Sequence, residues 1–247
     1  MVAVGGMDPG GGAGLLRDVA TARARGALAR AVGTAWTEQG PGIHELEPRS
    51  PATVARGLRL ALAGRPGAIK IGMAVGPATA AAILEALEGC ALPVVVDPVL
   101  ASSRGGALWG AHPADQLPLV RRATLATPNA GEAAALTGLP VTTVEEAEAA
   151  ARKLVAGGAR AVLVKGGHLG GGDGAVTDVM VTADGGFRFS RPRTPGPTPR
   201  GTGCALATAI AVELARGAPL EAAVRIAGDW LAAAIRAATT RGDERRL

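Results

Sequence analysis

The sequence predicts an α/β fold in which helices cover both faces of a mostly parallel sheet. Short runs rich in valine and isoleucine alternate with longer segments at helical spacing. The run Pro93–Pro98 holds three consecutive valines, as expected for a parallel strand covered on both faces. Later, two apolar runs flank Ala183-Asp-Gly185, which predicts one antiparallel hairpin. Since no linker or repeat interrupts the chain, we expect a single domain over residues 1–247, with a disordered tail at about 240–247.

Strands and helices are expected to alternate through the first half of the chain. Val2–Gly5 is a short apolar run, and the glycine-rich segment Gly6–Gly14 leads from it into residues at helical spacing. Ser50 is typical of a helix N-cap that is followed by proline. The expected elements are a strand at 2–5, a helix at 15–25, a strand at 27–37, a turn at 38–42, a helix at 51–63, a strand at 68–73, a helix at 77–89 and a strand at 93–98.

Two capping patterns mark helices in the second half. Asn129 and Thr143 each precede a helical segment whose third residue is a glutamate, Glu132 or Glu146. The expected elements are a strand at 123–128, helices at 130–137 and 144–156, a strand at 161–166, hairpin strands at 176–182 and 186–190, and helices at 202–216 and 219–239.

Composition excludes several classes of function. The chain has 247 residues, of which 48% are apolar, and a formal net charge of +5, which suits an anionic small-molecule substrate. Aromatic residues make up 2% and tyrosine is absent, so a base-stacking surface for nucleic acid is not expected. No stretch is apolar enough to span a membrane, and the N-terminus does not resemble a secretion signal. Two cysteines make no disulfide framework, which predicts a cytoplasmic location.

The segment Gly201–Cys204 is expected to bind negative charge. Two glycines flank Thr202 and allow a tight turn, and the apolar residues from Ala205 onward form a good helix. The backbone N–H groups would point out of the helix N-terminus, where the helix dipole favours an anion or charge that develops during a reaction. Cys204 lies in the first turn, so we predict a thiol pKa below the ordinary value of about 8.5 and faster reaction than at Cys90.

Polar residues gather where the expected strands end. Because ligands bind at the carboxyl ends of parallel strands, these positions are candidates for a binding site. Asp97 follows three valines, and burying a carboxylate is costly unless it is paired or lies near a metal ion. Asn129 and Glu132 lie one helical turn apart, which fits both a capping box and shared, water-mediated coordination of Mg²⁺. The strand-end positions are Asp8, Glu38, Met73, Asp97, Asn129 and Lys165.

Six motifs occur in the order found in one known family. They are Gly6–Gly14, Lys70–Met73, Asp97–Val99, Thr127–Glu132, Lys165–Leu169 and Gly201–Cys204. From residue 2 to about 238 the chain resembles the hydroxymethylpyrimidine/phosphomethylpyrimidine kinases of thiamine synthesis, in the ribokinase-like superfamily. The resemblance implies a three-layer α/β/α sandwich, ATP with Mg²⁺, and a homodimer. It also implies phosphorylation of 4-amino-5-hydroxymethyl-2-methylpyrimidine to the monophosphate and then to the diphosphate.

The resemblance further implies roles for individual residues. Cys204 would be the catalytic base, beside the amides of Gly201, Thr202 and Gly203. The nucleotide would contact Lys165, Asn129 and Arg200, and the metal ion would lie near Glu132 and Asp97. The pyrimidine would contact Glu38, Asp18, Met73, Ala13, Gly6 and Val99. Carboxylates complement the amino group of such a ring, and methionine offers a soft apolar contact.

Several assignments have a plainer alternative. Cys204 is otherwise a buried and inert thiol, Lys165 a solvated lysine at a strand end, Asp18 a surface residue of a helix, and Glu38 a turn residue. Two other functions also stay open. One is a vitamin B6 kinase, since pyridoxal-type alcohols present a similar ring and hydroxymethyl group. The other is a catalytically silent sensor that binds the pyrimidine.

Two segments depart from the family pattern. Thr198-Pro-Arg200 stands where the family often has Asn-Thr-His, so Arg200 itself is expected to contact ATP. Ser103-Arg-Gly105 occupies the place of a Lys/Ser-Gly segment. The stretches 170–174 and 191–199 are rich in glycine or proline and are expected to form mobile lid loops.

Overall fold

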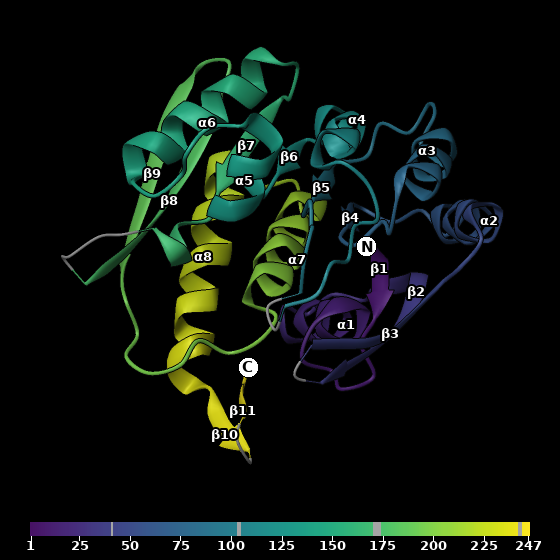
Figure 1. Ribbon diagram of the computed structural model, residues 1–247, viewed down its shortest axis with the longest axis horizontal. Coiled ribbons are helices and arrows are strands. Elements are labelled where there is room, and N and C mark those ends of the chain that lie inside the picture. Colours follow the sequence, from purple (N-terminus) through teal and green to yellow (C-terminus); the bar gives the residue numbers. More distant parts are fainter. Residues whose placement is uncertain (41, 103–104, 170–173, 242–243) are drawn as a thin grey trace.

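The computed structural model describes residues 1–40, 42–102, 105–169, 174–241 and 244–247. Over these residues, nine strands form one sheet in the order β3-β2-β1-β4-β5-β6-β7-β8-β9 (Figure 1). The pairings that join β2, β1, β4, β5, β6 and β7 are parallel, whereas those of β3, β8 and β9 are antiparallel. The predicted, mostly parallel sheet is therefore confirmed.

The elements follow the predicted alternation closely. The strands of the sheet are β1 (Val2–Met7), β2 (Arg30–Gly40), β3 (Gly42–Pro48), β4 (Ile69–Ile71), β5 (Val94–Val96), β6 (Leu125–Ala126), β7 (Ala161–Val164), β8 (Ala175–Thr182) and β9 (Gly185–Pro192). The helices are α1 (Gly14–Ala24), α2 (Pro51–Leu62), α3 (Pro77–Ala86), α4 (Leu117–Arg122), α5 (Ala130–Thr137), α6 (Val144–Ala156), α7 (Thr202–Ala215) and α8 (Leu220–Ala237). Two short 3₁₀ turns are η1 (Pro113–Gln116) and η2 (Gly166–His168).

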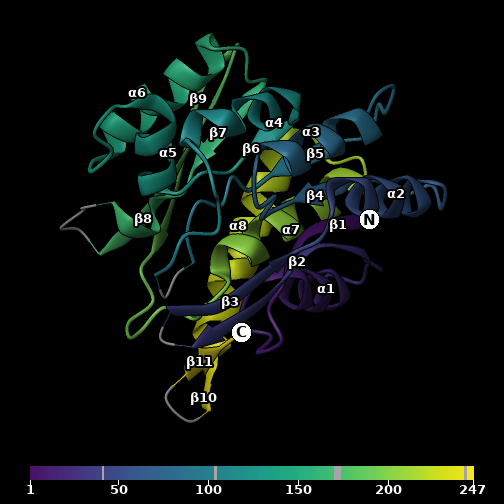
Figure 2. The same cartoon turned by 45° about the vertical axis from the view of Figure 1, so that its right-hand side comes forward.

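Helices cover both faces of the sheet, which gives the expected α/β/α layers (Figures 1 and 2). Strand β5 shows which helices cover each face of the sheet, because successive side chains of a strand point to opposite sides. Val94 and Val96 pack in the core beneath α2 to α6, whereas Val95 packs in the core beneath α7 and α8. Helix α1 lies beside α7 on this second face.

Helix α7 is the central helix of the second face. Its residues from Ala205 to Leu214 are all buried, as expected for a helix that is apolar on every side. Glu213 is the charged exception within that run, and it pairs at 2.6 Å with Arg25, the C-cap residue of α1. Across the described part of the chain, no helix is long and apolar enough to cross a membrane.

The local sequence signals predicted some elements and missed others. The caps at Asn129 and Thr143 form complete capping boxes, as predicted. The turn expected at residues 38–42 is wrong in its bounds, because β2 continues to Gly40. Strand β3 was not expected, since its charged residues hide the alternation, and α4 is too short to show a clear period. Two further strands, β10 (Thr239–Arg241) and β11 (Glu244–Arg246), pair near the end of the chain; the disorder expected there stays a prediction.

Candidate active site

Four polar side chains extend from strand ends toward the N-terminus of α7. Each stands two positions after a residue that packs on the α7 side of the sheet, so strand alternation directs it to that same side. The preceding residues are Ala68, Val95, Leu125 and Leu163. The polar residues are Lys70, Asp97, Thr127 and Lys165. The carboxyl edge of the parallel sheet, where ligands bind in such folds, therefore faces the Gly201–Cys204 segment.

The N-terminus of α7 has the geometry of an anion site. Gly201 adopts a left-handed conformation with φ of 72°, and a Cβ added there would lie 2.3 Å from the carbonyl oxygen of Gly12. Both facts require glycine at this position. No side chain caps this end of the helix among the described residues. Its first N–H groups therefore remain available for a bound anion.

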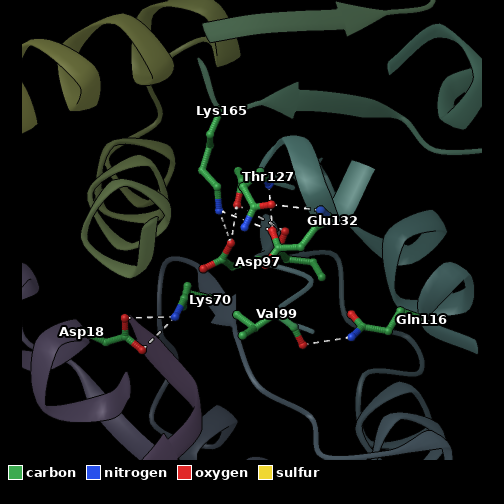
Figure 3. Close-up of polar contacts among 10 residues, drawn as sticks. Asp18, Lys70, Asp97, Val99, Gln116, Thr127, Glu132 and Lys165 are labelled. Carbon is green, nitrogen blue, oxygen red and sulfur yellow. Dashed lines mark hydrogen bonds and ion pairs between the residues drawn. The ribbon is translucent and has the colours of Figure 1, made fainter. Parts of the chain in front are cut away.

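Lys165 brings positive charge to this helix end (Figure 3). Its Nζ donates to Asp97 Oδ1 at 2.6 Å and lies 3.8 Å from Glu132 Oε2. A Cβ added to Gly203 would stand 3.2 Å from the same Nζ, so the ammonium group lies directly beside the anion site. Burial alone would lower the pKa of Lys165, but Asp97 and Glu132 outweigh it and raise the pKa. The lysine stays charged, and the interpretation as a solvated strand-end lysine is wrong.

Glu132 serves as a helix cap and also faces the charge cluster. Its Oε2 accepts from the backbone N–H of Asn129 at 2.7 Å, while Asn129 Oδ1 accepts from the N–H of Glu132 at 2.9 Å. Burial raises the pKa of Glu132 to about 7, against the opposing effect of Lys165 and with the help of nearby Asp97. The capping box predicted from the sequence is confirmed. The predicted role at a metal ion stays a prediction.

The charges of the cluster suit a divalent cation. Asp97 and Glu132 offer two carboxylates against the single ammonium of Lys165, so a negative charge remains when both are ionised. Across the described ranges, no group of three His, Cys, Asp or Glu side chains gathers as a metal site. A fully protein-made cage is not required, because Mg²⁺ in kinases usually keeps waters and binds substrate phosphates with one or two carboxylates.

Three of the predicted acceptor residues form one apolar wall. Met73 belongs to a small buried cluster with Ala35 and Leu108, against which Val99 packs. A Cβ added to Gly6 would lie 2.5 Å from the Met73 Cε, so the methionine side chain packs directly on Gly6 and would have to move for a larger residue. The structure therefore brings Gly6, Met73 and Val99 together at the carboxyl end of β1 and β4.

Asp8 and Arg200 join the glycine loop to the anion site. Asp8 accepts from the backbone N–H groups of Gly10 and Ala13 at 3.0 and 3.1 Å. Arg200 reaches the same carboxylate at 3.5 Å, and its guanidinium would be 2.8 Å from a Cβ at Gly12. A Cβ added to Gly201 would lie 3.3 Å from the Cα of Ala13, so the two residues are neighbours. Contact of Ala13 with the pyrimidine stays a prediction. Contact between Arg200 and the nucleotide stays a prediction.

Two other predicted acceptor residues lie apart from the wall. Asp18 has no exposed side-chain surface and pairs with Lys70 Nζ at 2.9 Å, so the interpretation as a surface helix residue is wrong. Glu38 is exposed on β2, two residues beyond Trp36, where the pairing with β1 ends. It is therefore a strand residue and not a turn residue. Direct contact of either carboxylate with the pyrimidine stays a prediction.

The predicted direction of the Cys204 pKa is wrong. Cys204 keeps partial exposure in the first turn of α7, but burial raises the pKa of its thiol, while the positive charge of Lys70 opposes that change. Asp18 and Asp97 raise the pKa further. The helix end and the N–H of Gly14 favour the thiolate, as the sequence suggests, but they are outweighed by desolvation, which depends on the whole fold.

Asp178 of β8 supports the site and was missed from the sequence. Its Oδ1 accepts from the N–H of Gly166 at 2.8 Å, and Arg191 holds its other oxygen at 3.3 Å. A Cβ on Gly166 would meet the carbonyl oxygen of Thr177 at 1.9 Å, so the turn after Lys165 is packed tightly against β8. The available signal was a charged residue, Asp178, inside a predicted strand.

The expected lids are described only in part. Residues 103–104 and 170–173 lie outside the described residues, so the Ser103-Arg-Gly105 segment and most of the 170–174 loop are not compared. Of the 191–199 stretch, the first two residues belong to β9 and the rest is irregular. Lid motion stays a prediction.

Comparison with known proteins agrees with this geometry. The family model described as phosphomethylpyrimidine kinase matches residues 8–246. A hydroxymethylpyrimidine/phosphomethylpyrimidine kinase of Rhizobium meliloti is 38% identical over 243 residues, which cover 96% of this chain and 90% of that protein. A thiamine biosynthesis bifunctional protein of Geobacter sulfurreducens is also 38% identical, over 98% of this chain; the chain spans 50% of that relative's length.

Solved structures show the same architecture. Phosphomethylpyrimidine kinase from Clostridium difficile superposes with a TM-score of 0.81 and 29% identity, covering 95% of this chain and 98% of that one. Pyridoxal kinase from Staphylococcus aureus in complex with ADP gives a TM-score of 0.88 at 25% identity, covering 100% and 92%. The predicted ribokinase-like fold is confirmed, and the chain belongs to the phosphomethylpyrimidine kinase family.

Proposed function

We propose that this chain uses ATP to phosphorylate 4-amino-5-hydroxymethyl-2-methylpyrimidine, and then the monophosphate, to the diphosphate. The observation that carries the proposal is the ammonium of Lys165 beside Gly203, at a helix N-terminus that no described side chain caps. A cation and free N–H groups at one point are suited to a phosphoryl group in transfer. The wall of Gly6, Met73 and Val99 supplies the apolar surface for a planar ring.

The chain would act mainly by positioning and by stabilising charge. The N–H groups of Gly201–Cys204 and the ammonium of Lys165 would hold the transferring phosphoryl group. Asn129 and Arg200 would contact the nucleotide, and Asp97 and Glu132 would hold Mg²⁺ through water. When bound, Mg²⁺ would neutralise part of the negative charge of the nucleotide phosphates. Glu38 would accept a hydrogen bond from the ring amino group.

Cys204 would remove the proton of the acceptor in the first step. The step needs the thiolate form of Cys204, which burial makes less abundant. The thiolate takes the hydroxyl proton and becomes a thiol, while the oxygen lone pair forms a bond to the γ-phosphorus. The bond from that phosphorus to its bridging oxygen breaks, and the electron pair leaves with ADP. Cys204 then returns its proton to solvent, to which it is partly exposed.

The second step differs in its need for a base. The acceptor is then a phosphate monoester, which has a second pKa of about 6 and is mostly ionised at neutral pH. Its attacking oxygen carries no proton to be removed, so Cys204 is needed less in this step. The two substrates therefore separate the role of the thiol from the role of the anion site.

An ATP-consumption assay tests the proposal with hydroxymethylpyrimidine, its monophosphate and pyridoxal in parallel. We expect turnover with both pyrimidines and a lower kcat/KM with pyridoxal. Higher kcat/KM with pyridoxal would instead establish a vitamin B6 kinase. Pyrimidine binding without ATP consumption would establish the silent sensor and overturn the proposal.

We further propose that the enzyme is a homodimer and is located in the cytoplasm. The homodimer rests on the family resemblance, and the location rests on the two cysteines, which make no disulfide framework. Light scattering coupled to size-exclusion chromatography measures the first, and a mass near 24.4 kDa at micromolar concentration would contradict it. Fractionation of cells that express the tagged chain measures the second.

A further inference from the structure

Lys70 is a fully buried lysine in the middle of an otherwise apolar strand. Its side chain is 1% exposed, and that of its partner Asp18 is 0% exposed. A buried ion pair is a weak source of stability, because the cost of removing two charges from water offsets their attraction. An apolar pair of similar size would often serve the fold as well. Stability of the fold alone therefore does not explain why a charged pair is buried at this position.

The pair contacts α7 at Thr208, one helical turn beyond Cys204. Thr208 donates to Asp18 Oδ1 at 2.8 Å, while Lys70 Nζ bonds both oxygens of Asp18 at 2.9 and 3.0 Å. The Lys70 chain runs toward the carboxyl end of β4, since a Cβ at Gly72 would stand 2.8 Å from its Nζ. Figure 3 shows Lys70 between Asp18 and Asp97.

Charges from four elements act electrostatically on the thiol of Cys204. Lys70 of β4 opposes the effect of burial on the thiol pKa, and Asp18 of α1 and Asp97 after β5 reinforce it. Lys165, after β7, also interacts with the sulfur. Of the charged groups, Lys70 has the largest effect on Cys204. Asp18 is thus placed to hold the ammonium, and the ammonium is placed to act on the thiol.

We propose that Lys70 is a positioning residue for phosphoryl transfer, whose ammonium, held by Asp18, stabilises the thiolate of Cys204; Thr208 in turn fixes Asp18. The inference rests on the proposed function, because it gives Cys204 the role of proton acceptor. The step that it assists is the one described above: the O–H bond of the acceptor breaks, an S–H bond forms, and ADP leaves with the electron pair of the broken P–O bond. Lys70 exchanges no proton in it.

The test measures the thiol directly and not through turnover. In the full-length Cys90→Ser chain, Cys204 is the one remaining cysteine, and the pH midpoint of its alkylation by iodoacetamide reports the thiol pKa. We expect Lys70→Met to raise this midpoint by about 1–3 pH units, the usual effect of losing an adjacent opposite charge. Asp18→Asn should lower the midpoint, because the ammonium then acts without its counterion. Lys153→Met, a change at an exposed lysine of α6, should leave it unchanged.

A purely structural role would not produce opposite shifts. Movement of both midpoints in the same direction, or of neither, would overturn the proposal. Where a single variant fails to fold, the double variant Lys70→Met/Asp18→Asn removes both buried charges at once. Its midpoint should lie above that of the Cys90→Ser parent, because Lys70 acts on Cys204 more strongly than Asp18 does. An unchanged midpoint in a folded double variant would overturn the proposal.

A kinetic measurement separates this inference from the proposed function. Lys70→Met should shift the pH profile of kcat for hydroxymethylpyrimidine to higher pH and leave the profile for the monophosphate nearly in place. If the unmodified chain consumes no ATP with either pyrimidine, the proposed function fails. If it is active but Lys70→Met changes neither the alkylation midpoint nor the first-step profile, the Lys70 inference alone fails.

Discussion

Replacing Glu132 by glutamine should make the protein more stable at neutral pH and less active. Glutamine keeps an oxygen that can accept from the Asn129 N–H, so the cap survives. What the variant loses is the charge that burial opposes, since burial raises the pKa of Glu132 from 4.5 to about 7. The predicted role at Mg²⁺ needs that charge, whereas the cap does not.

The size and pH range of the effect follow from that pKa. Between pH 4.5 and about 7 the folded chain keeps a proton on Glu132 that the unfolded chain has released. The free energy of unfolding of the parent therefore falls as pH rises through this range. The full difference corresponds to about 3 kcal/mol. Glu132→Gln should gain up to about that amount above pH 7 and nothing below pH 4.5, which corresponds to a rise in Tm of roughly 6–12 °C for a chain of this size.

Urea unfolding at pH 5 and pH 8 measures the predicted change in stability. ATP turnover as a function of Mg²⁺ concentration measures the predicted change in the metal requirement. Glu146→Gln is a matched control, because Glu146 occupies the same place in the capping box of Thr143. There the hydrogen bonds of Thr142 lower the pKa of the exposed carboxyl, so the control should gain no stability with rising pH. It should also leave the Mg²⁺ requirement unchanged.

Three results would count against this reasoning about Glu132. If Glu132→Gln is less stable than the parent at pH 8, the carboxylate contributes to folding beyond its cap. If its stability difference is the same at pH 5 and pH 8, the carboxyl does not titrate in the inferred range. Unchanged Mg²⁺ dependence, with either stability outcome, would remove Glu132 from the metal site.

Three further predictions concern the anion site and the acceptor. Cys204→Ala should reduce kcat for hydroxymethylpyrimidine by about 10²–10⁴, and reduce it less for the monophosphate, in steady-state assays of both steps; equal losses would argue against a base role. Gly203→Ala should keep or raise the free energy of unfolding by about 0.5–1 kcal/mol, yet lower kcat/KM roughly 10–100-fold, because its Cβ would stand 3.2 Å from Lys165 Nζ. Glu38→Ala should weaken pyrimidine binding by about 1–3 kcal/mol with little change for ATP, measured by calorimetry; an unchanged pyrimidine affinity would exclude Glu38 from the site.

Local patterns predicted those parts of the structure that depend on neighbouring residues. The capping boxes of α5 and α6 involve residues three positions apart, and both are present. The three valines of β5 predicted a strand buried on both faces, and they divide between the two cores as expected. Strand alternation would also have placed Asp97 and Lys165 on one side of the sheet. The candidate site could therefore be located from the sequence at the level of strand ends.

Contacts between distant residues could not be predicted in the same way. Lys70 and Asp18 are 52 positions apart, and Thr208 is 190 positions from Asp18. Nothing local distinguishes an aspartate on a helix surface from one that is fully buried against a strand and another helix. The prediction of a lowered thiol pKa for Cys204 was wrong for the same reason. The helix end is a local feature of the sequence, whereas desolvation of the thiol depends on the packed fold.

The candidate site joins these distant residues into a row of alternating charge. Asp18, Lys70, Asp97, Lys165 and Glu132 follow one another along the carboxyl edge of the sheet, with three carboxylates and two ammonium groups (Figure 3). Asp18 and Glu132 end the row, and burial raises the pKa of both carboxyls, that of Glu132 to about 7. Of these two ends, Glu132 is the one that also caps α5. Its structural and functional interpretations do not exclude each other, because the cap needs only the oxygen atoms and a bound cation would need the charge.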